Sequence, residues 1–318
     1  MKKVSIIVPM YNEEEAAPLF FEHIQKVINS CSNYEFEIVA VNDGSTDKTL
    51  DILLAKQKEL PHLVVVDLSR NWGHESAVTA GLKEASGDCL IPIDADLQDP
   101  PEIIPEMLSM WEDGYQVVNA QRGSRAKDSS FKKNTAGIYY KLLNHLSHKV
   151  KVPQNVANFR LLDRRVANHV IELQETSRVF RVQVPFLGFK TGTVLFSRDQ
   201  RVKGKSKYNV SAMFNLALSS IVSLTTRPLR WSIGVTIFFG CSFLVSGLTE
   251  LVLYILSINN VITSISGLGY GIWLIVNVML FIGTFIFFLL GVISIYLSQA
   301  VEDARRRPTV IVNKVYKK

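Results

Sequence analysis

Cysteine is scarce in this sequence, and several patterns that mark common functions are missing. The 318 residues include three cysteines, Cys31, Cys89 and Cys241, whose spacing fits no metal-binding motif. So few cysteines are typical of a reducing compartment. No G-x-G-x-x-G run is present, which excludes the usual dinucleotide fingerprint. Helix-turn-helix, zinc and aromatic-platform patterns are missing too, so nucleic acid is not expected as a partner.

Charged residues are absent from most of the last third of the chain. Between Arg230 and Glu302 only Glu250 carries a charge. Two segments within this stretch, Trp231–Ile258 and Gly271–Leu297, exceed the roughly 20 helical residues that cross a hydrocarbon core. A buried pair of soluble helices is the alternative, but it would need shorter, amphipathic helices. The sequence therefore predicts two transmembrane helices.

Basic residues flank the two apolar segments on their outer sides and are missing from the loop between them. They are Arg227 and Arg230 before the first segment, and Arg305, Arg306, Arg307, Lys314, Lys317 and Lys318 after the second. The positive-inside rule places both flanks in the cytoplasm. Met1–Lys3 leads directly into a strand-like segment and does not resemble a signal peptide. We expect a multi-pass protein of the cell membrane whose amino-terminal domain lies in the cytoplasm, and its net charge of +6 suits anionic lipid.

Strand and helix patterns alternate over the first 125 residues. Apolar runs at Val4–Pro9, Glu37–Val41, Leu63–Leu68 and Asp88–Ile93 predict strands, and helical patterns separate them. Such alternation predicts a Rossmann-like α/β domain with a mostly parallel sheet.

The predicted organisation has four parts. They are a cytoplasmic domain of residues 1–207, an interfacial amphipathic region of residues 208–228, a transmembrane hairpin of residues 229–300 and a basic cytoplasmic tail of residues 301–318. The second part is predicted because apolar residues recur there at helical spacing just before the first apolar segment. An ordinary helix of the domain is the alternative.

Two carboxylates, Asp94 and Asp96, directly follow the fourth predicted strand. Paired hard oxygen ligands suit Mg²⁺ or Mn²⁺, which share their remaining sites with water and substrate phosphates. A solvated turn is the alternative. Three more polar clusters follow the other strands, and open α/β sheets bind ligands at that edge. These clusters are Tyr11-Asn12-Glu13, Asp43-Gly44-Ser45 and Arg70-Asn71-Trp72-Gly73.

These motifs carry a family resemblance. The chain resembles inverting family-2 glycosyltransferases of GT-A fold, and among them the group that transfers sugars to polyisoprenyl phosphate, such as dolichol-phosphate mannose synthase and bacterial lipid-linked glucosyl transferases. The resemblance rests on Ser5–Glu14, Val41–Asp47, Leu68–Gly73, Pro92–Pro101, Arg122–Arg125, Asn158–Arg164 and Arg201–Tyr208, which together extend over nearly the whole chain.

The resemblance implies roles for particular residues. It assigns the base and ribose of a nucleotide sugar to Pro9, Tyr11, Glu13 and Asp43, the metal and diphosphate to Asp94 and Asp96, the sugar to Gln98, and the diphosphate or lipid phosphate to Arg201 and Lys207. We also expect Arg122 and Arg125 to bind the lipid phosphate, because a guanidinium grips phosphate with a bidentate fork. A homo-oligomer, with a tetramer as one form, is implied as well.

Two positions depart from the pattern of the group. His74 stands where relatives carry Lys, which removes a fixed charge from any diphosphate contact there. Asn158 stands where close relatives carry Asp. We do not expect an obligatory base at this position, because a phosphate monoester titrates at about pH 6 and is mostly dianionic at neutral pH.

The sequence thus predicts a membrane-anchored, metal-dependent transfer of a hexose from a nucleotide sugar to polyisoprenyl phosphate, such as undecaprenyl phosphate, for cell-surface glycan modification. UDP-glucose is the first choice of donor and UDP-GlcNAc the second. A processive polysaccharide synthase is disfavoured, because only Arg230-Trp231 remains of its Gln-x-x-Arg-Trp motif. A membrane scaffold that only binds nucleotide sugar is the alternative from another class, and Asn158 is its support.

Overall fold

The computed structural model describes residues 1–123, 153, 156–173, 175, 179–196 and 268–317, with isolated positions between 229 and 259. The chain divides into two compact units, Met1–Ile221 with Arg306–Lys318 and Val222–Arg305. Three of the predicted site residues, Arg125, Arg201 and Lys207, lie outside the described residues. The same holds for residues 208–228 and for most of the first apolar segment.

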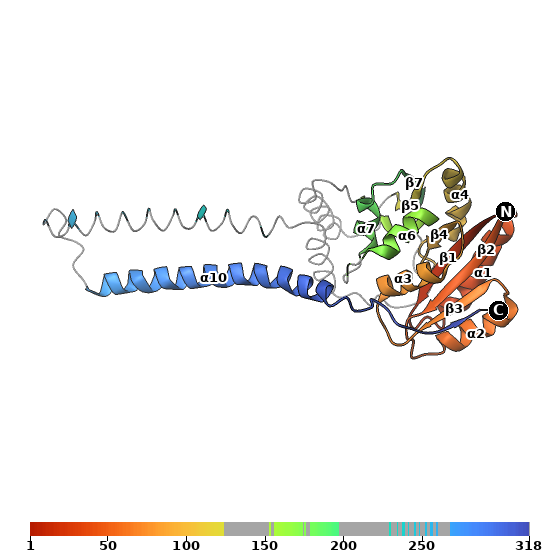
Figure 1. The fold of residues 1–318 in the computed structure, drawn as a ribbon, viewed down its shortest axis with the longest axis horizontal. Coiled ribbons are helices and arrows are strands. Elements are labelled where there is room, and N and C mark those ends of the chain that lie inside the picture. Colours follow the sequence, from red (N-terminus) through yellow and green to blue (C-terminus); the bar gives the residue numbers. More distant parts are fainter. Residues whose placement is uncertain are drawn as a thin grey trace. The chain divides into compact units, whose positions relative to one another are not determined.

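The first unit is built on an eight-stranded sheet with the strand order β7-β5-β6-β4-β1-β2-β3-β8 (Figure 1). The strands are β1 (Lys2–Met10), β2 (Tyr34–Asn42), β3 (Leu63–Leu68), β4 (Cys89–Pro92), β5 (Val117–Arg122), β6 (Val156–Asp163), β7 (Thr191–Phe196) and β8 (Val312–Tyr316). Strands β1 to β4 are mutually parallel where they pair, whereas β6 and β8 run antiparallel to their neighbours. The predicted α/β class with a mostly parallel sheet is confirmed.

Helices cover both faces of this sheet. They are α1 (Ala16–Ser30), α2 (Thr49–Glu59), α3 (His74–Glu84), the 3₁₀ helix η1 (Pro101–Ile103), α4 (Ile104–Glu112), α6 (Arg164–Glu172) and α7 (Phe180–Phe186). Alternate side chains of β1 serve the two faces: Ile6 packs in the core with α1, α2 and α4, and Ile7 packs in the core with α3, α6 and α7. A Cβ at Gly81 would lie 2.3 Å from Ile7 Cγ2, so glycine lets α3 press closely against β1.

The segment predicted as a basic tail contributes a strand to the sheet. Residues 312–316 form β8, which pairs antiparallel with β3 at one edge. Val312 and Val315 pack against the core on the α3 face, and Tyr316 packs against the core on the other face. The predicted basic tail of residues 301–318 therefore includes a strand of the sheet, and its place in the cytoplasm stays a prediction.

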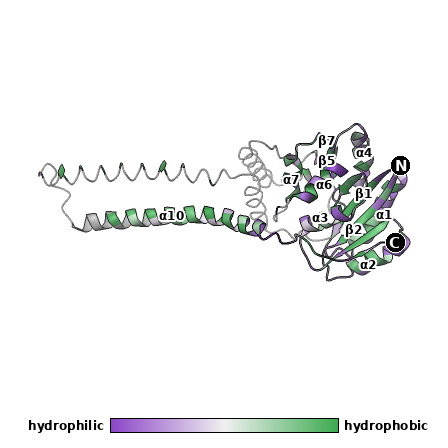
Figure 2. Ribbon diagram, viewed as in Figure 1, coloured by the Kyte–Doolittle hydropathy of each residue, from purple (hydrophilic) through white to green (hydrophobic). Residues whose placement is uncertain are grey.

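The second unit contains α10 (Leu268–Ala304), a helix of 37 residues that includes the predicted segment Gly271–Leu297. At 1.5 Å per residue it is about 55 Å long. Within it, Phe281–Ala304 is the one helical stretch among the described residues that is long and apolar enough to cross a membrane, with a mean hydropathy of 2.2 (Figure 2). The partner helix of the predicted hairpin stays a prediction.

Candidate active site

The carboxyl ends of β1 and β2 lie side by side at one edge of the sheet. Met10 pairs with Asn42 in the parallel register, and the backbone N–H of Asp43 donates to the carbonyl of Met10 at 2.9 Å. Pro9 precedes this point and is buried in β1. The two polar clusters that follow these strands therefore start next to each other, as the sequence predicts.

The loops beyond these two strands are hydrogen-bonded to one another. The backbone N–H of Asn12 donates to Ser45 Oγ at 3.0 Å, and the backbone N–H of Thr46 donates to Asn12 Oδ1 at 2.8 Å. Asn12 has a φ of 52°, a left-handed conformation that asparagine tolerates better than most residues. These bonds fix the chain on both sides of Asn12, so the half-buried side chains of Tyr11 and Glu13 are held at this edge.

Asp43 ties the end of β2 to the loop that follows β3. One carboxylate oxygen accepts the backbone N–H of Trp72 at 2.7 Å, and the other accepts that of Gly73 at 3.0 Å. Burial raises the pKa of the Asp43 carboxyl above its ordinary value, although both amides oppose the shift. Gly44 has a φ of 63°, and a Cβ there would lie 2.3 Å from the backbone carbon of Arg70. Glycine is therefore required for the two loops to lie against each other.

The carboxylate pair follows β4 in a loop with an alternating pattern of burial. Ala95 is buried, whereas Asp94 and Asp96 on either side of it are half-buried. Leu97 has a φ of 55°, and the backbone N–H of Gln98 then donates to Asp96 Oδ1 at 3.1 Å. A left-handed leucine is uncommon, and such strain concentrates at functional sites. Its side chain packs against the core, which holds the loop in place.

The carboxylate oxygens of this loop suit a hard divalent cation whose other ligands come mostly from water or substrate. Asp94 and Asp96 supply carboxylate oxygens, and the Asp94 side chain is 42% exposed. His74, in the first turn of α3, places Nε2 3.6 Å from Asp94 Oδ1. The described residues contain no cluster of three or more His, Cys, Asp or Glu that could enclose a metal by themselves. A bound cation would therefore need phosphate oxygens and water to complete its coordination.

Asn158, on β6, faces a glutamate in the first turn of α3. Its Nδ2 donates to Glu75 Oε1 at 3.3 Å, and the backbone N–H of Phe180 donates to Glu75 Oε2 at 3.4 Å. The buried Oδ1 of Asn158 has no hydrogen-bond partner among the described residues. An aspartate at this position would set two carboxylates against each other, whereas the amide supplies a donor to Glu75.

Arg122, at the end of β5, pairs with a buried carboxylate of the same loop that carries Asp94 and Asp96. Its Nη2 lies 3.6 Å from Asp99 Oδ1, and the Asp99 side chain is 2% exposed. The ion pair connects the end of β5 to the carboxylate loop after β4. The guanidinium of Arg122 is thereby oriented at the same edge of the sheet.

The motifs at this edge are those of a known family. Residues 5–171, just over half of the chain, match the family model described as glycosyl transferase family 2. The chain belongs to glycosyl transferase family 2.

Relatives of this glycosyltransferase align with it over nearly their whole length. An uncharacterized glycosyltransferase of Bacillus subtilis, YkcC, is 36% identical over 98% of this chain and 94% of its own. The prophage bactoprenol glucosyl transferase homolog of Escherichia coli is 35% identical over 99% of this chain and 100% of its own. The bactoprenol glucosyl transferase of Shigella phage SfII is 36% identical over 99% of both.

Solved structures match part of the chain at much lower identity. A glucosyl-3-phosphoglycerate synthase from Mycobacterium tuberculosis, crystallised with Mn²⁺, UDP-glucose and phosphoglyceric acid, is 18% identical. The match covers 70% of this chain and 78% of that one, with a TM-score of 0.48.

The structure adds residues to the candidate site of this glycosyltransferase that the sequence motifs alone did not assign. Glu75 and Asp99 hold Asn158 and Arg122 respectively. Asn42 and Ser45 lie behind Asp43 and join the loops. Each of these four residues lies in or close to one of the motifs that carry the family resemblance. Their contacts are with residues that are distant in the sequence, so the motifs alone do not assign them a role.

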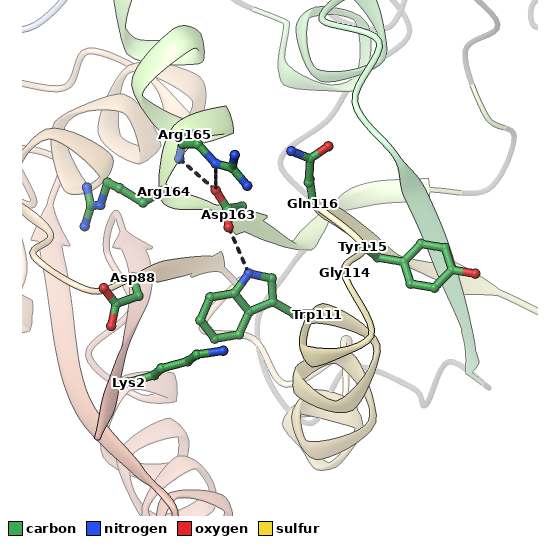
Figure 3. Close-up of a pocket in the computed structure, with 9 residues that line it drawn as sticks. All are labelled: Lys2, Asp88, Trp111, Gly114, Tyr115, Gln116, Asp163, Arg164 and Arg165. Atoms are coloured by element: carbon green, nitrogen blue, oxygen red, sulfur yellow. Dashed lines mark hydrogen bonds and ion pairs between the residues drawn. The ribbon is translucent and has the colours of Figure 1, made fainter.

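A separate hollow of about 460 Å³ opens at the opposite edge of the sheet (Figure 3). It is lined by Lys2, Asp88, Trp111, Gly114, Tyr115, Gln116, Asp163, Arg164 and Arg165. Asp163 accepts hydrogen bonds from Trp111 Nε1 at 3.0 Å and from Arg165 Nε at 3.2 Å. Burial opposes the shift, but these hydrogen bonds hold the pKa of Asp163 below its ordinary value. None of the predicted site residues lines this hollow, because it opens where β1, β4 and β5 begin.

Proposed function

We propose that this glycosyltransferase moves a hexose from a nucleotide sugar to polyisoprenyl phosphate at the cytoplasmic face of the cell membrane, with inversion at the anomeric carbon. The observation that carries the proposal is the set of polar side chains at the carboxyl ends of β1 to β4, which includes the half-buried carboxylate pair Asp94 and Asp96. The full-length relatives named for bactoprenol glucosyl transfer support the lipid acceptor and UDP-glucose as the first donor to test. UDP-GlcNAc is the second.

The nucleotide would lie across the loops that follow β1 and β2. Tyr11, Glu13 and Asp43 then face the base and ribose, with Pro9 buried beneath them. Asp43 retains lone pairs for a ring N–H while its oxygens accept the amides of the β3 loop. Gln98 lies two residues beyond Asp96 and would face the sugar.

Asp94 and Asp96 would hold Mg²⁺ or Mn²⁺ at the diphosphate. When bound, the cation supplies neutralisation of the charge that develops on the departing diphosphate. Arg122, oriented by Asp99, would hold the lipid phosphate close to the sugar. Arg125, Arg201 and Lys207 enter this proposal from the sequence alone.

The acceptor needs no general base in this reaction. A phosphate oxygen attacks the anomeric carbon from the side opposite to the diphosphate, the bond from that carbon to the diphosphate oxygen breaks, and nucleoside diphosphate leaves. Because the attacking oxygen carries no proton at neutral pH, an amide at position 158 is compatible with turnover. Asn158 instead donates to Glu75 and so fixes β6 against the first turn of α3.

The first test is transfer itself. Purified full-length protein in detergent, given undecaprenyl phosphate, Mn²⁺ and radiolabelled UDP-glucose, is expected to form a labelled lipid that mild acid cleaves, with UDP released in equal amount. Undecaprenol without its phosphate is the matched control acceptor and should stay unlabelled. UDP-GlcNAc tested in parallel decides the sugar. Binding of UDP without transfer of either sugar would favour the alternative of a non-catalytic scaffold. That alternative is considered because Asn158 stands where relatives carry Asp.

The second test concerns orientation, since the catalytic domain must meet cytoplasmic nucleotide sugar. In a Cys241→Ser background, Ser264→Cys should react with an impermeant maleimide on intact cells, whereas Glu106→Cys should react only after lysis. Glu106 is exposed on α4, so a cysteine there is accessible to the maleimide. Cys31 and Cys89 are buried and are not expected to react with it. Labelling of Glu106→Cys without lysis would reverse the proposed topology.

A further inference from the structure

Strand β8 carries a β-bulge at Asn313. In its pairing with β3, Val312 lies opposite Leu68 and Lys314 lies opposite Asp67, so Asn313 is the extra residue. A bulge leaves one residue out of the ladder and redirects its side chain. At this bulge, Asn313 Nδ2 donates to Asp67 Oδ2 at 2.8 Å.

The carboxylate of Asp67 links β8 to β2. Asp67 is 7% exposed, and its other oxygen accepts Asn42 Nδ2 at 2.8 Å. A buried carboxylate depends on its hydrogen-bond donors. Two asparagine amides, one from β8 and one from β2, therefore meet on one buried charge.

Asn42 connects Asp67 to the loops of the candidate nucleotide site through hydrogen bonds. Its Oδ1 accepts the backbone N–H of Ser45 at 3.2 Å, and Ser45 Oγ accepts the backbone N–H of Asn12 at 3.0 Å. Asn42 also directly precedes Asp43. The hydrogen-bonded series therefore runs from β8 through β3 and β2 to the loops that present Tyr11 and Asp43.

A second connection reaches Asp43 from the other side. The backbone N–H of Ser69 donates to the carbonyl of Ile311 at 3.1 Å, at the start of the loop after β3. In that loop Trp72 Nε1 donates to Ser69 Oγ at 3.2 Å, and the Trp72 backbone N–H donates to Asp43. The loop after β3 is therefore held at Ser69 by the segment that leads into β8 and at Trp72 by Asp43.

We propose that Asn313 is a positioning residue for nucleotide binding, acting through Asp67 and Asn42 on the loops around Asp43. The proposal rests on the proposed nucleotide site at the carboxyl ends of β1 and β2. It gives β8 a role in the affinity of the site for a nucleoside diphosphate, in addition to covering the edge of the sheet.

The test is the affinity of full-length protein in detergent for UDP in the presence of Mn²⁺, measured by calorimetry. We expect Asn313→Leu to raise the Kd for UDP about three- to thirtyfold, the scale of coupling carried through hydrogen-bond networks. Lys314→Ala, a change to the next residue of the same strand, is the matched control and should leave the Kd unchanged. Thermal unfolding of each variant separates loss of affinity from loss of stability.

An exchange of the two partners gives a second readout. Asn313→Asp sets two carboxylates against each other, and Asp67→Asn leaves one acceptor oxygen where two amide donors meet, so each alone should weaken UDP binding. The double variant restores one donor and one acceptor at the pair and keeps an oxygen for Asn42. We expect it to return the Kd to within about twofold of wild type.

Three outcomes overturn the proposal: a Kd within about twofold of wild type in folded Asn313→Leu, equal weakening by Lys314→Ala, or failure of the double variant to recover affinity lost in Asn313→Asp. If wild type itself does not bind UDP, the nucleotide site of the proposed function is wrong. Weakened binding in Asn313→Leu with recovery in the double variant supports the inference whichever sugar is transferred.

Discussion

Asp96→Ala is expected to lower the rate of sugar transfer by about a hundred- to a thousandfold, the loss that follows removal of one group that stabilises charge in a transition state. The motive is the half-buried carboxylate pair after β4, whose Asp96 is aligned by the backbone N–H of Gln98. The measurement is initial rate of lipid labelling at saturating Mn²⁺. Wild type should lose its activity in EDTA and regain it when Mn²⁺ is added back.

Asp113→Ala is the matched control for this change. Asp113 is an exposed aspartate at the end of α4, in the same domain and away from the strand ends that carry the site. Its removal should leave transfer unchanged, which separates the loss of one particular carboxylate from the loss of any carboxylate. Unaltered transfer in Asp96→Ala, or full turnover of wild type in EDTA, would show that the pair holds no essential cation.

Arg122→Lys is expected to raise the KM for undecaprenyl phosphate about ten- to hundredfold, because the loss of a hydrogen bond to a charged group costs roughly 1.5–3 kcal/mol. Lysine keeps the charge but not the planar fork that binds phosphate through two donors. The KM for UDP-glucose should change little. Asp99→Asn should have an intermediate effect on the acceptor, since it removes the buried charge that orients the Arg122 guanidinium.

Arg165→Lys is the control for the arginine change. Arg165 is exposed in the hollow at the opposite edge, where it pairs with Asp163. The same chemical change there should alter neither KM. If Arg122→Lys instead weakens binding of UDP-glucose and spares the lipid phosphate, the assignment of Arg122 to the acceptor is wrong.

The sequence predicted the strands that form from short apolar runs between turn residues. Strand Leu63–Leu68 was predicted with the bounds of β3, and the other three predicted strands overlap β1, β2 and β4 with shifts at their ends. Apolar runs of that length between turn residues leave little choice of conformation. The carboxylate pair was placed at a strand end for the same reason, since only Ile93 separates Asp94 from the buried strand β4.

The sequence could not reveal the pairs that depend on contacts between distant residues. Asn158 meets Glu75 and Arg122 meets Asp99 only because β6 and β5 insert beside β4 in the order β5-β6-β4. The same limit applies to β8: Val312–Tyr316 is short, contains lysine and has no partner nearby in the chain. Its pairing with β3 requires a closure over more than two hundred residues, for which the sequence offers no local signal.

The position of β8 along the chain also bears on how the enzyme folds during its synthesis. Strands β1, β2 and β3 are translated before the segment that forms α10, and β8 is translated after it. Until then β3 presents an unpaired edge, which is open to pairing with other chains. The nascent domain can fold its central strands early but cannot close its sheet before the apolar helix has been made. A product truncated within α10 would therefore leave the buried carboxylate of Asp67 without its donor from Asn313, and the sheet without its last strand.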